Sequence, residues 1–197
     1  MGNPTSTELG VARGVATGAL SWAGRSVTPQ PATPSAAGTS LAAGFVGLGY
    51  IGSDGIQPTR DVSTDDAKDM NGDTVATLQT DFARTYQAEL LQHRNVDIKK
   101  MIFGSANVAE TAATATLGKR IHVSDRGEPS EHGMLVADTF DGTSKHREVA
   151  TDAQPTSVEF GPLVGTALRS YTVTWTVFRG SDGVFVHEYD DDGITAA

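Results

Sequence analysis

The fold is decided by one stretch of the sequence, Thr74-Val-Ala-Thr-Leu-Gln-Thr-Asp-Phe-Ala-Arg-Thr-Tyr-Gln-Ala-Glu-Leu-Leu91. Large apolar residues occupy one parity of this stretch, at Leu78, Phe82, Tyr86 and Leu90. Polar residues dominate the other parity, at Gln79, Asp81, Thr85, Gln87 and Glu89. Successive side chains of a strand point to opposite faces. The stretch therefore predicts one long strand, or two strands joined at a kink, with a dry face toward a core and a wet face.

Further strands are predicted on both sides of this stretch. Strict alternation between Tyr171 and Phe178 indicates a strand, and Ser181-Asp-Gly183 predicts a turn that pairs it with residues 184–189 in a final hairpin. Shorter runs predict strands at residues 15–22, 44–52, 119–123 and 134–140, and edge strands at residues 145–150 and 156–160 around Pro155. A chain of 197 residues can bury one sizeable core, so we expect a mainly β single domain over residues 14–189, a β sandwich or barrel.

One short flanking α-helix is predicted after the long strand. Asn95 belongs to the preferred N-terminal cap residues, and Gly104 is well placed to end the helix. Val96, Lys99 or Lys100, and Phe103 fall on one stripe of this helix. Residues 27–40 contain three prolines, which predict an extended surface loop. The ends, residues 1–13 and 190–197, carry no periodicity and are expected to be a flexible N-terminal arm and a flexible tail.

Charged residues dominate the connection between Ser53 and Asp73. They include Asp54, Arg60, Asp61, Asp65, Asp66, Lys68 and Asp69. Asn71-Gly72 is a hairpin-type turn signal. A connection of this length is uncommon in a compact domain and is usually functional or disordered. We therefore expect residues 53–73 to form a long charged hairpin loop that is mobile in the free subunit.

The charge balance and the missing cysteines exclude several classes of protein. The chain carries 15 basic and 24 acidic residues, a net charge of −9, whereas proteins that grip nucleic acid need clustered Lys and Arg. Without cysteine there is no disulfide framework, thiolate metal site or thiol nucleophile. No run approaches the ~18 apolar residues of a membrane span, and no signal-peptide pattern begins the chain. We expect assembly in the cytoplasm and no membrane partner.

Several motifs resemble chemical sites but lack the required context. Gly47-Leu-Gly-Tyr-Ile-Gly52 matches a dinucleotide fingerprint, yet the residues that follow it do not start a helix. Asp190-Asp-Asp-Gly193 begins like a calcium loop but has no later acidic ligand. The five histidines lack metal-ligand spacing, and Asp138 and Asp141 read as solvated turn residues. The sequence therefore predicts neither catalytic residues, nor a metal site, nor a cofactor.

Three segments together carry a resemblance to a known family. Gly14-Val-Ala-Thr-Gly-Ala-Leu-Ser-Trp-Ala23 precedes the proline-rich loop, and Phe45-Val-Gly-Leu-Gly-Tyr-Ile-Gly-Ser-Asp-Gly55 is an apolar β segment that ends in a glycine turn. The acidic connection and Gly72-Asp-Thr-Val-Ala-Thr-Leu-Gln-Thr-Asp81 follow. These segments, taken in this order with the short helix and the closing Tyr-Thr-Val-Thr-Trp segment, cover nearly the whole chain. Together they resemble the tail-tube (major tail) proteins of siphophages, which are bacteriophages with long, non-contractile tails.

This resemblance implies a structural virion protein. Six copies would close into a ring, and rings would stack into a tube through which DNA passes without specific binding, with tape-measure, tail-terminator and tail-tip proteins as further partners. We expect Gln79, Asp81, Gln87 and Glu89 to line the channel, because an acidic, polar surface repels phosphate. The charged residues between Ser53 and Asp73 are expected to contact the next ring. Two alternatives remain open: the tube ring of a phage-related secretion or injection system, and a β-sandwich carbohydrate-binding module.

Overall fold

The computed structural model describes residues 12–14 and 18–194, and in this part the chain is mainly β with one α-helix, as predicted. The predicted arm at residues 1–13 lies almost wholly outside the described residues, as do residues 195–197 of the tail. The elements are β1 (Arg13–Gly14), β2 (Leu20–Gly24), β3 (Val46–Gly47), β4 (Ile51–Lys68), β5 (Thr74–Leu90), α1 (Val96–Phe103), the 3-10 helix η2 (Ser105–Asn107), β6 (Val108–Thr111), β7 (Arg120–Val123), β8 (Gly133–Asp141), β9 (Ser144–Phe160), β10 (Tyr171–Val177) and β11 (His187–Asp191).

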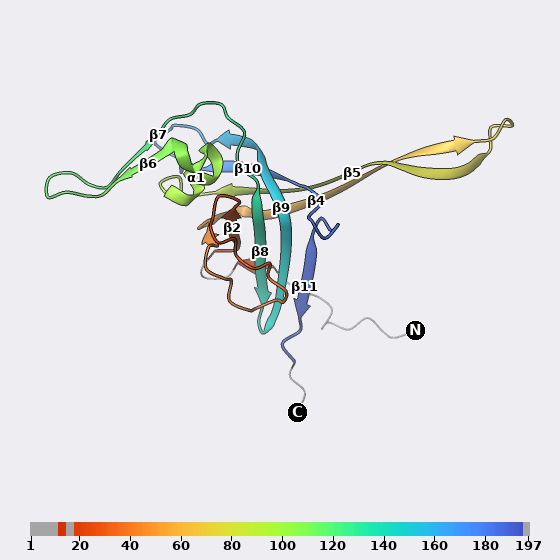
Figure 1. Ribbon diagram of the computed structural model, residues 1–197, viewed down its shortest axis with the longest axis horizontal. Helices are drawn as coiled ribbons and strands as arrows, with labels where there is room; N and C mark the ends of the chain where they lie inside the picture. The colour runs from red at the N-terminus through yellow and green to blue at the C-terminus, as the bar shows by residue number, and fades with distance from the viewer. Residues whose placement is uncertain (1–11, 15–17, 195–197) are drawn as a thin grey trace.

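One antiparallel sheet forms the body of the protein (Figure 1). Its strand order is β3-β2-β8-β9-β10-β5-β4, and in addition β1 pairs with β8 and β11 pairs with β9. The strands β6 and β7 form a separate hairpin beside α1. The strand β9 joins two halves of the sheet, because β8 occupies one edge of it while β11 and β10 share the other.

The two strands predicted around Pro155 are instead one continuous strand, β9. Proline is confined to edges or bulges because it has no N–H for the ladder. Here Pro155 lies opposite Trp175 at a register shift between Thr174 and Trp175, which leaves Thr156 without an opposed residue. Beyond the Gly133–Ala153 pair, β10 is the only paired neighbour of β9 among the described residues, so Pro155 occupies a bulge in a part of β9 that has one free edge, as predicted for residues 156–160. The prediction of two separate strands was wrong because a residue that usually ends a strand is tolerated at this irregularity.

The predicted final hairpin is also wrong. β10 runs antiparallel to β9 from the Tyr171–Phe160 pair to the Val177–Ala153 pair, and β11 continues along the same edge of β9 in the same direction. Both neighbours of β10 are already taken, by β5 and β9. Residues 178–186 therefore form a loop that connects two strands lying end to end along β9. Asp190 and Asp191, predicted to be frayed, belong to β11.

The core lies between the sheet and α1. Trp175, Tyr86, Tyr171 and Leu90 are fully buried there, and Leu20 and Trp22 of β2 belong to the same cluster. The predicted helix is confirmed: the Asn95 Oδ1 atom accepts a hydrogen bond from the Asp97 N–H at 2.9 Å, and Gly104 ends the helix with a φ of 86°. The buried face differs from the predicted stripe and consists of Val96, Ile98, Met101 and Ile102.

The two N-terminal strand predictions are displaced. The predicted strand at residues 15–22 begins later, at Leu20, while residues 15–17 lie outside the described residues. The predicted strand at residues 44–52 is split, because Gly49 adopts a φ of 75° between β3 and β4. A strand, not a helix, follows Gly52, so the dinucleotide-type glycine motif lacks the helix N-terminus that a pyrophosphate needs.

Candidate assembly surfaces

A long hairpin of β4 and β5 projects from the sheet, as Figure 1 shows. We define the projecting hairpin as residues 61–82. It contains six aspartates and one lysine, giving a net charge of −5. Nearly all of it is exposed, on both faces of the ladder. Pro58 pairs with buried Tyr86, and Lys68 lies ten residues further along β4, near the tip. At about 3.3 Å per residue, this part of the strand spans roughly 30 Å.

The loop predicted at residues 53–73 is therefore mostly strand. β4 extends to Lys68, and only residues 69–73 form a turn. Oxygen Oδ1 of Asp69 accepts hydrogen bonds from the Asn71 and Asp73 N–H groups at 2.8 and 2.9 Å, and these bonds hold the pKa of Asp69 below its usual range. The prediction failed because a ladder with water on both faces needs no alternation of apolar and polar residues.

The four predicted channel-lining residues do not share one face. Asp81 pairs with Ser63 and Gln79 pairs with Thr64, so the register shifts by one residue at Thr80. Consecutive residues of β4 point to opposite faces, and paired residues share a face. Gln79 therefore lies on the face opposite Asp81, and Leu78, predicted to be dry, is exposed. A bulge that the simple parity of the sequence does not reveal separates these residues.

The remaining predicted residues belong to a polar face of β5 and β10. Gln87 pairs with Thr174, and its side-chain amide donates a hydrogen bond to the Thr174 Oγ1 atom at 3.1 Å. Glu89 pairs with Thr172 and accepts a hydrogen bond from Ser170 at 2.5 Å, so this carboxylate is anchored and half-buried. The other face of the same strands is core. The prediction that β5 has one polar and one buried face is therefore confirmed for the part that pairs with β10.

The charged residues of β4 separate into two groups. Asp61, Asp65, Asp66, Lys68 and Asp69 lie along the projecting hairpin. Asp54 lies at the root of β4, near Gly18 and Gln92, in a surface hollow that the hairpin does not reach. Arg60 lies between these groups, with its guanidinium 5.2 Å from the centre of the Phe82 ring. The structure thus brings together all the predicted contact residues except Asp54.

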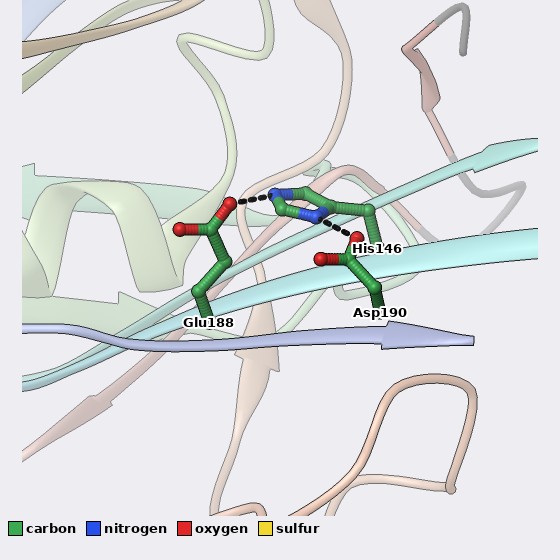
Figure 2. Close-up of side chains that lie close together, drawn as sticks. All are labelled: His146, Glu188 and Asp190. Atoms are coloured by element: carbon green, nitrogen blue, oxygen red, sulfur yellow. Dashed lines mark hydrogen bonds and ion pairs between the residues drawn. The ribbon is translucent and has the colours of Figure 1, made fainter. Parts of the chain in front are cut away.

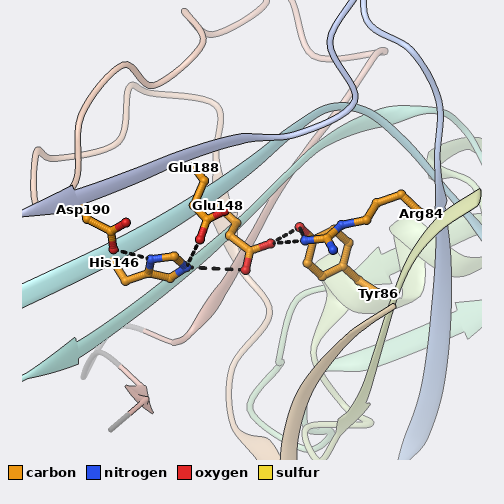
Figure 3. Close-up of polar contacts among 6 residues, drawn as sticks. All are labelled: Arg84, Tyr86, His146, Glu148, Glu188 and Asp190. Atoms are coloured by element: carbon orange, nitrogen blue, oxygen red, sulfur yellow. Dashed lines mark hydrogen bonds and ion pairs between the residues drawn. The ribbon is translucent and has the colours of Figure 1, made fainter. Parts of the chain in front are cut away.

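A polar network at the root of the projecting hairpin links β5 to β9 (Figure 3). Glu148 of β9 forms an ion pair with Arg84 at 2.8 Å and accepts a hydrogen bond from the Tyr86 hydroxyl. Burial and the Glu148 carboxylate raise the pKa of Tyr86. The residues come from β5 and β9, far apart in the sequence, and no motif or spacing marks them. Sequence reasoning missed this network for that reason.

His146 extends the network onto β11, as Figure 2 shows. Its Nδ1 atom lies 2.7 Å from Asp190, and its Nε2 atom lies 3.4 Å from Glu148 and 3.8 Å from Glu188. Glu148 and Glu188 are directly opposed across the β9–β11 ladder, where like charges are destabilising. His146, Glu188 and Asp190 offer ligand types that a divalent metal ion accepts, but both of these carboxylates are exposed and both ring nitrogens already have carboxylate partners.

We expect the free energy of unfolding to depend on the charge of His146. Burial opposes protonation of this ring, but hydrogen bonds to Asp190 and Glu148 outweigh it and raise the pKa above the ordinary 6.5. A group whose pKa is raised on folding stabilises the fold fully below its unfolded pKa, and the gain is lost as pH rises through the folded pKa.

His146→Gln should therefore cost stability at pH 5.5, by under about 1 kcal/mol for a part-exposed pair, and cost less at pH 8.5. Urea unfolding at both pH values measures this difference. The matched control is His122→Gln, because His122 is exposed on β7 and has no ion pair among the described residues. Equal losses for His146→Gln at the two pH values would show that the charge of the ring does not stabilise β11.

Asp138 is not the solvated turn residue that its sequence position suggests. Its carboxylate accepts two hydrogen bonds from the buried guanidinium of Arg147, at 2.5 and 2.9 Å. The same guanidinium donates to the backbone carbonyls of Ala36 and Thr39, at 2.9 and 2.8 Å. The pair therefore fastens the proline-rich loop to the sheet.

No known family model matches this chain, and no curated protein matches it either. In the part of the chain that the structure describes, the one α-helix is too short to cross a membrane. The geometry of the surfaces above is thus the basis for assigning a function.

Proposed function

We propose that the chain is the tail-tube subunit of a long-tailed bacteriophage, which assembles into stacked hexameric rings and catalyses nothing. The observation that carries this proposal is the projecting hairpin. A two-stranded hairpin in water is marginally stable by itself, and this one extends well beyond the core with exposed faces on both sides. A hairpin of this kind gains stability from a neighbouring subunit.

The sheet itself supports assembly of several copies. The outer edge of β4 is unpaired among the described residues along its whole length from Ile51 to Lys68. Unpaired edges favour pairing with another chain, and closure into a ring of sheets removes them. The polar face of β5 and β10 carries Thr, Gln and Glu side chains and suits a channel that DNA crosses without being held.

The alternative of a carbohydrate-binding module is less well supported by the aromatic residues. Such a module needs aromatic rings exposed in a row. Trp22 and Trp175, Tyr86 and Tyr171 are all buried in the core. A tube ring of a phage-related secretion or injection system is supported by the same surfaces as the phage tube and differs in its cargo. In either case the site of action is a tube, which for the phage is part of the virion and is assembled in the host cytoplasm.

Negative-stain electron microscopy of the concentrated protein tests the proposal. We expect rings or hollow tubes, since the hairpin and the open edge are present on every copy. Particles that stay monomeric at every concentration, together with binding on a glycan array, would overturn the proposal in favour of the carbohydrate-binding module.

Cysteine labelling of the assembled protein tests which face lines the channel. The natural chain has no cysteine, so Gln87→Cys introduces a single thiol on the polar face of β5. In tubes we expect this thiol to react with a small maleimide but not with one that carries a long polymer. Arg126→Cys, an exposed position in the loop after β7, is the control and should react with both. Equal reaction of Gln87→Cys with the two reagents would place this face outside.

A further inference from the structure

A group of basic side chains gathers beside α1, at the end of the molecule away from the projecting hairpin. Partial burial lowers the pKa of the His93 ring, and the nearby cations Arg169 of the β9–β10 loop, Arg94 and Lys99 lower it further. Lys99 lies over the Tyr171 ring and 3.3 Å from its hydroxyl oxygen. None of these three cations has an ion pair among the described residues. They form a cluster of cations on a chain with a net charge of −9.

Exposed apolar side chains adjoin this patch. The loop between β9 and β10, closed by the Gly161 N–H bonded to the Ser170 carbonyl, exposes Leu163 by 79% and Leu168 by 72%. At the base of the loop, Phe160 is half exposed and stacks on Phe103 of α1 at 6.2 Å between ring centres. We define the basic end as Arg94, Lys99, Phe160, Leu163, Leu168 and Arg169. Contiguous apolar surface rimmed by charge is typical of a protein contact.

The projecting hairpin complements the basic end both in charge and in exposed apolar side chains. It supplies six aspartates, and between them it exposes Met70 almost completely, along with Val62, Val75 and Leu78. DNA phosphates would satisfy the cations of the basic end but not the leucines. The hairpin of a second copy of this chain matches the charge and covers the apolar groups on both sides.

We propose that the basic end receives the projecting hairpin of a second copy of the chain. This inference rests on the proposed function and names the surface through which one layer contacts the next. Figure 1 places the tip of β4 and β5 at one end of the molecule and α1, β6 and β7 at the other. A contact between opposite ends is heterologous, so each new copy presents a free end for the next. The contact itself therefore does not limit the number of layers that can stack.

Charge reversal tests the contact. Arg94→Glu with Arg169→Glu should abolish stacking, and so should Asp65→Lys with Asp66→Lys on the hairpin. A mixture of these two variants should stack again, because each reversed surface then meets its complement. The matched control is Arg13→Glu with Lys145→Glu, which makes the same charge change at two exposed positions that pair with Phe140 of β8, away from α1, and should stack normally. Thermal unfolding checks that each variant is folded. Stacking by the Arg94 and Arg169 variant alone would overturn the inference.

Cross-linking separates this inference from the proposed function. Met70→Cys in one copy and Leu168→Cys in another should be joined by a short bismaleimide when the two variants are mixed. A control mixture of Met70→Cys with Lys145→Cys, an exposed position at the start of β9, should give much less product. Cross-linking without tubes would support the contact and refute the tube. Tubes without this cross-link would support the tube and refute the contact.

Discussion

Tube formation is expected to be lost completely when residues 64–80 are replaced by Asn-Gly. The replacement removes the outer part of the projecting hairpin, in which no residue is buried. Ser63 and Asp81, which pair across β4 and β5, would then be joined by a two-residue hairpin turn. Tyr86 and Leu90 keep their core contacts, so the subunit should stay folded. Circular dichroism on heating and negative-stain microscopy measure the two results.

A second exposed hairpin provides the control for this truncation. Residues 112–119 form the tip of the β6–β7 hairpin, and Thr111 pairs with Arg120 at its base. Replacing these eight residues by Asn-Gly removes a similarly exposed tip and should leave tubes intact. Normal tubes from the variant without residues 64–80 would mean that the projecting hairpin has no role in assembly.

Arg147→Met is expected to destabilise the fold by about 3–5 kcal/mol, because it leaves the carboxylate of Asp138 without its buried partner. The carbonyls of Ala36 and Thr39 lose their donors as well. Replacing both members of a buried pair with apolar residues often restores stability. Arg147→Met combined with Asp138→Leu should therefore be more stable than Arg147→Met alone.

Urea unfolding measures these differences, and an exposed ion pair supplies the comparison. Arg25 is 62% exposed in its pair with Asp152, so Arg25→Met should cost less than about 1 kcal/mol. A loss of that small size for Arg147→Met would show that the loop over the sheet does not depend on the buried guanidinium.

Short-range sequence signals were sufficient to predict those elements whose structure depends only on residues within or next to them. The helix between Asn95 and Gly104 follows from its two ends, because a cap and a terminating glycine act within a few residues. The alternation at Tyr171–Val177 is visible because that strand is buried on one face only. The course of β9 through Pro155 and the in-line placement of β10 and β11 depend on which strands are already paired. That information is not local.

The candidate surfaces were predictable to a different extent. The charges of the projecting hairpin are evident in the sequence, but a strand with two wet faces resembles a loop, and the bulge at Thr80 reverses the parity of Gln79. The network of Arg84, Glu148 and His146 was missed because β5 and β9, far apart in the sequence, bring it together. The basic end was missed for a similar reason, since Arg94 and Arg169 are 75 positions apart in the printed sequence.

The projecting hairpin continues in line with the part of β5 that pairs with β10, and this arrangement has a mechanical consequence. Hydrogen bonds of an antiparallel ladder lie perpendicular to the strands. A pull on the hairpin tip along β5 therefore loads the bonds between the Tyr171–Leu90 and Thr176–Thr85 pairs together, in shear, and does not open them one after another. A pull at right angles to β5 would peel β4 away first, since β4 pairs with β5 alone in the described part of the chain. The subunit should thus resist tension along its long axis far better than bending at the root of the hairpin.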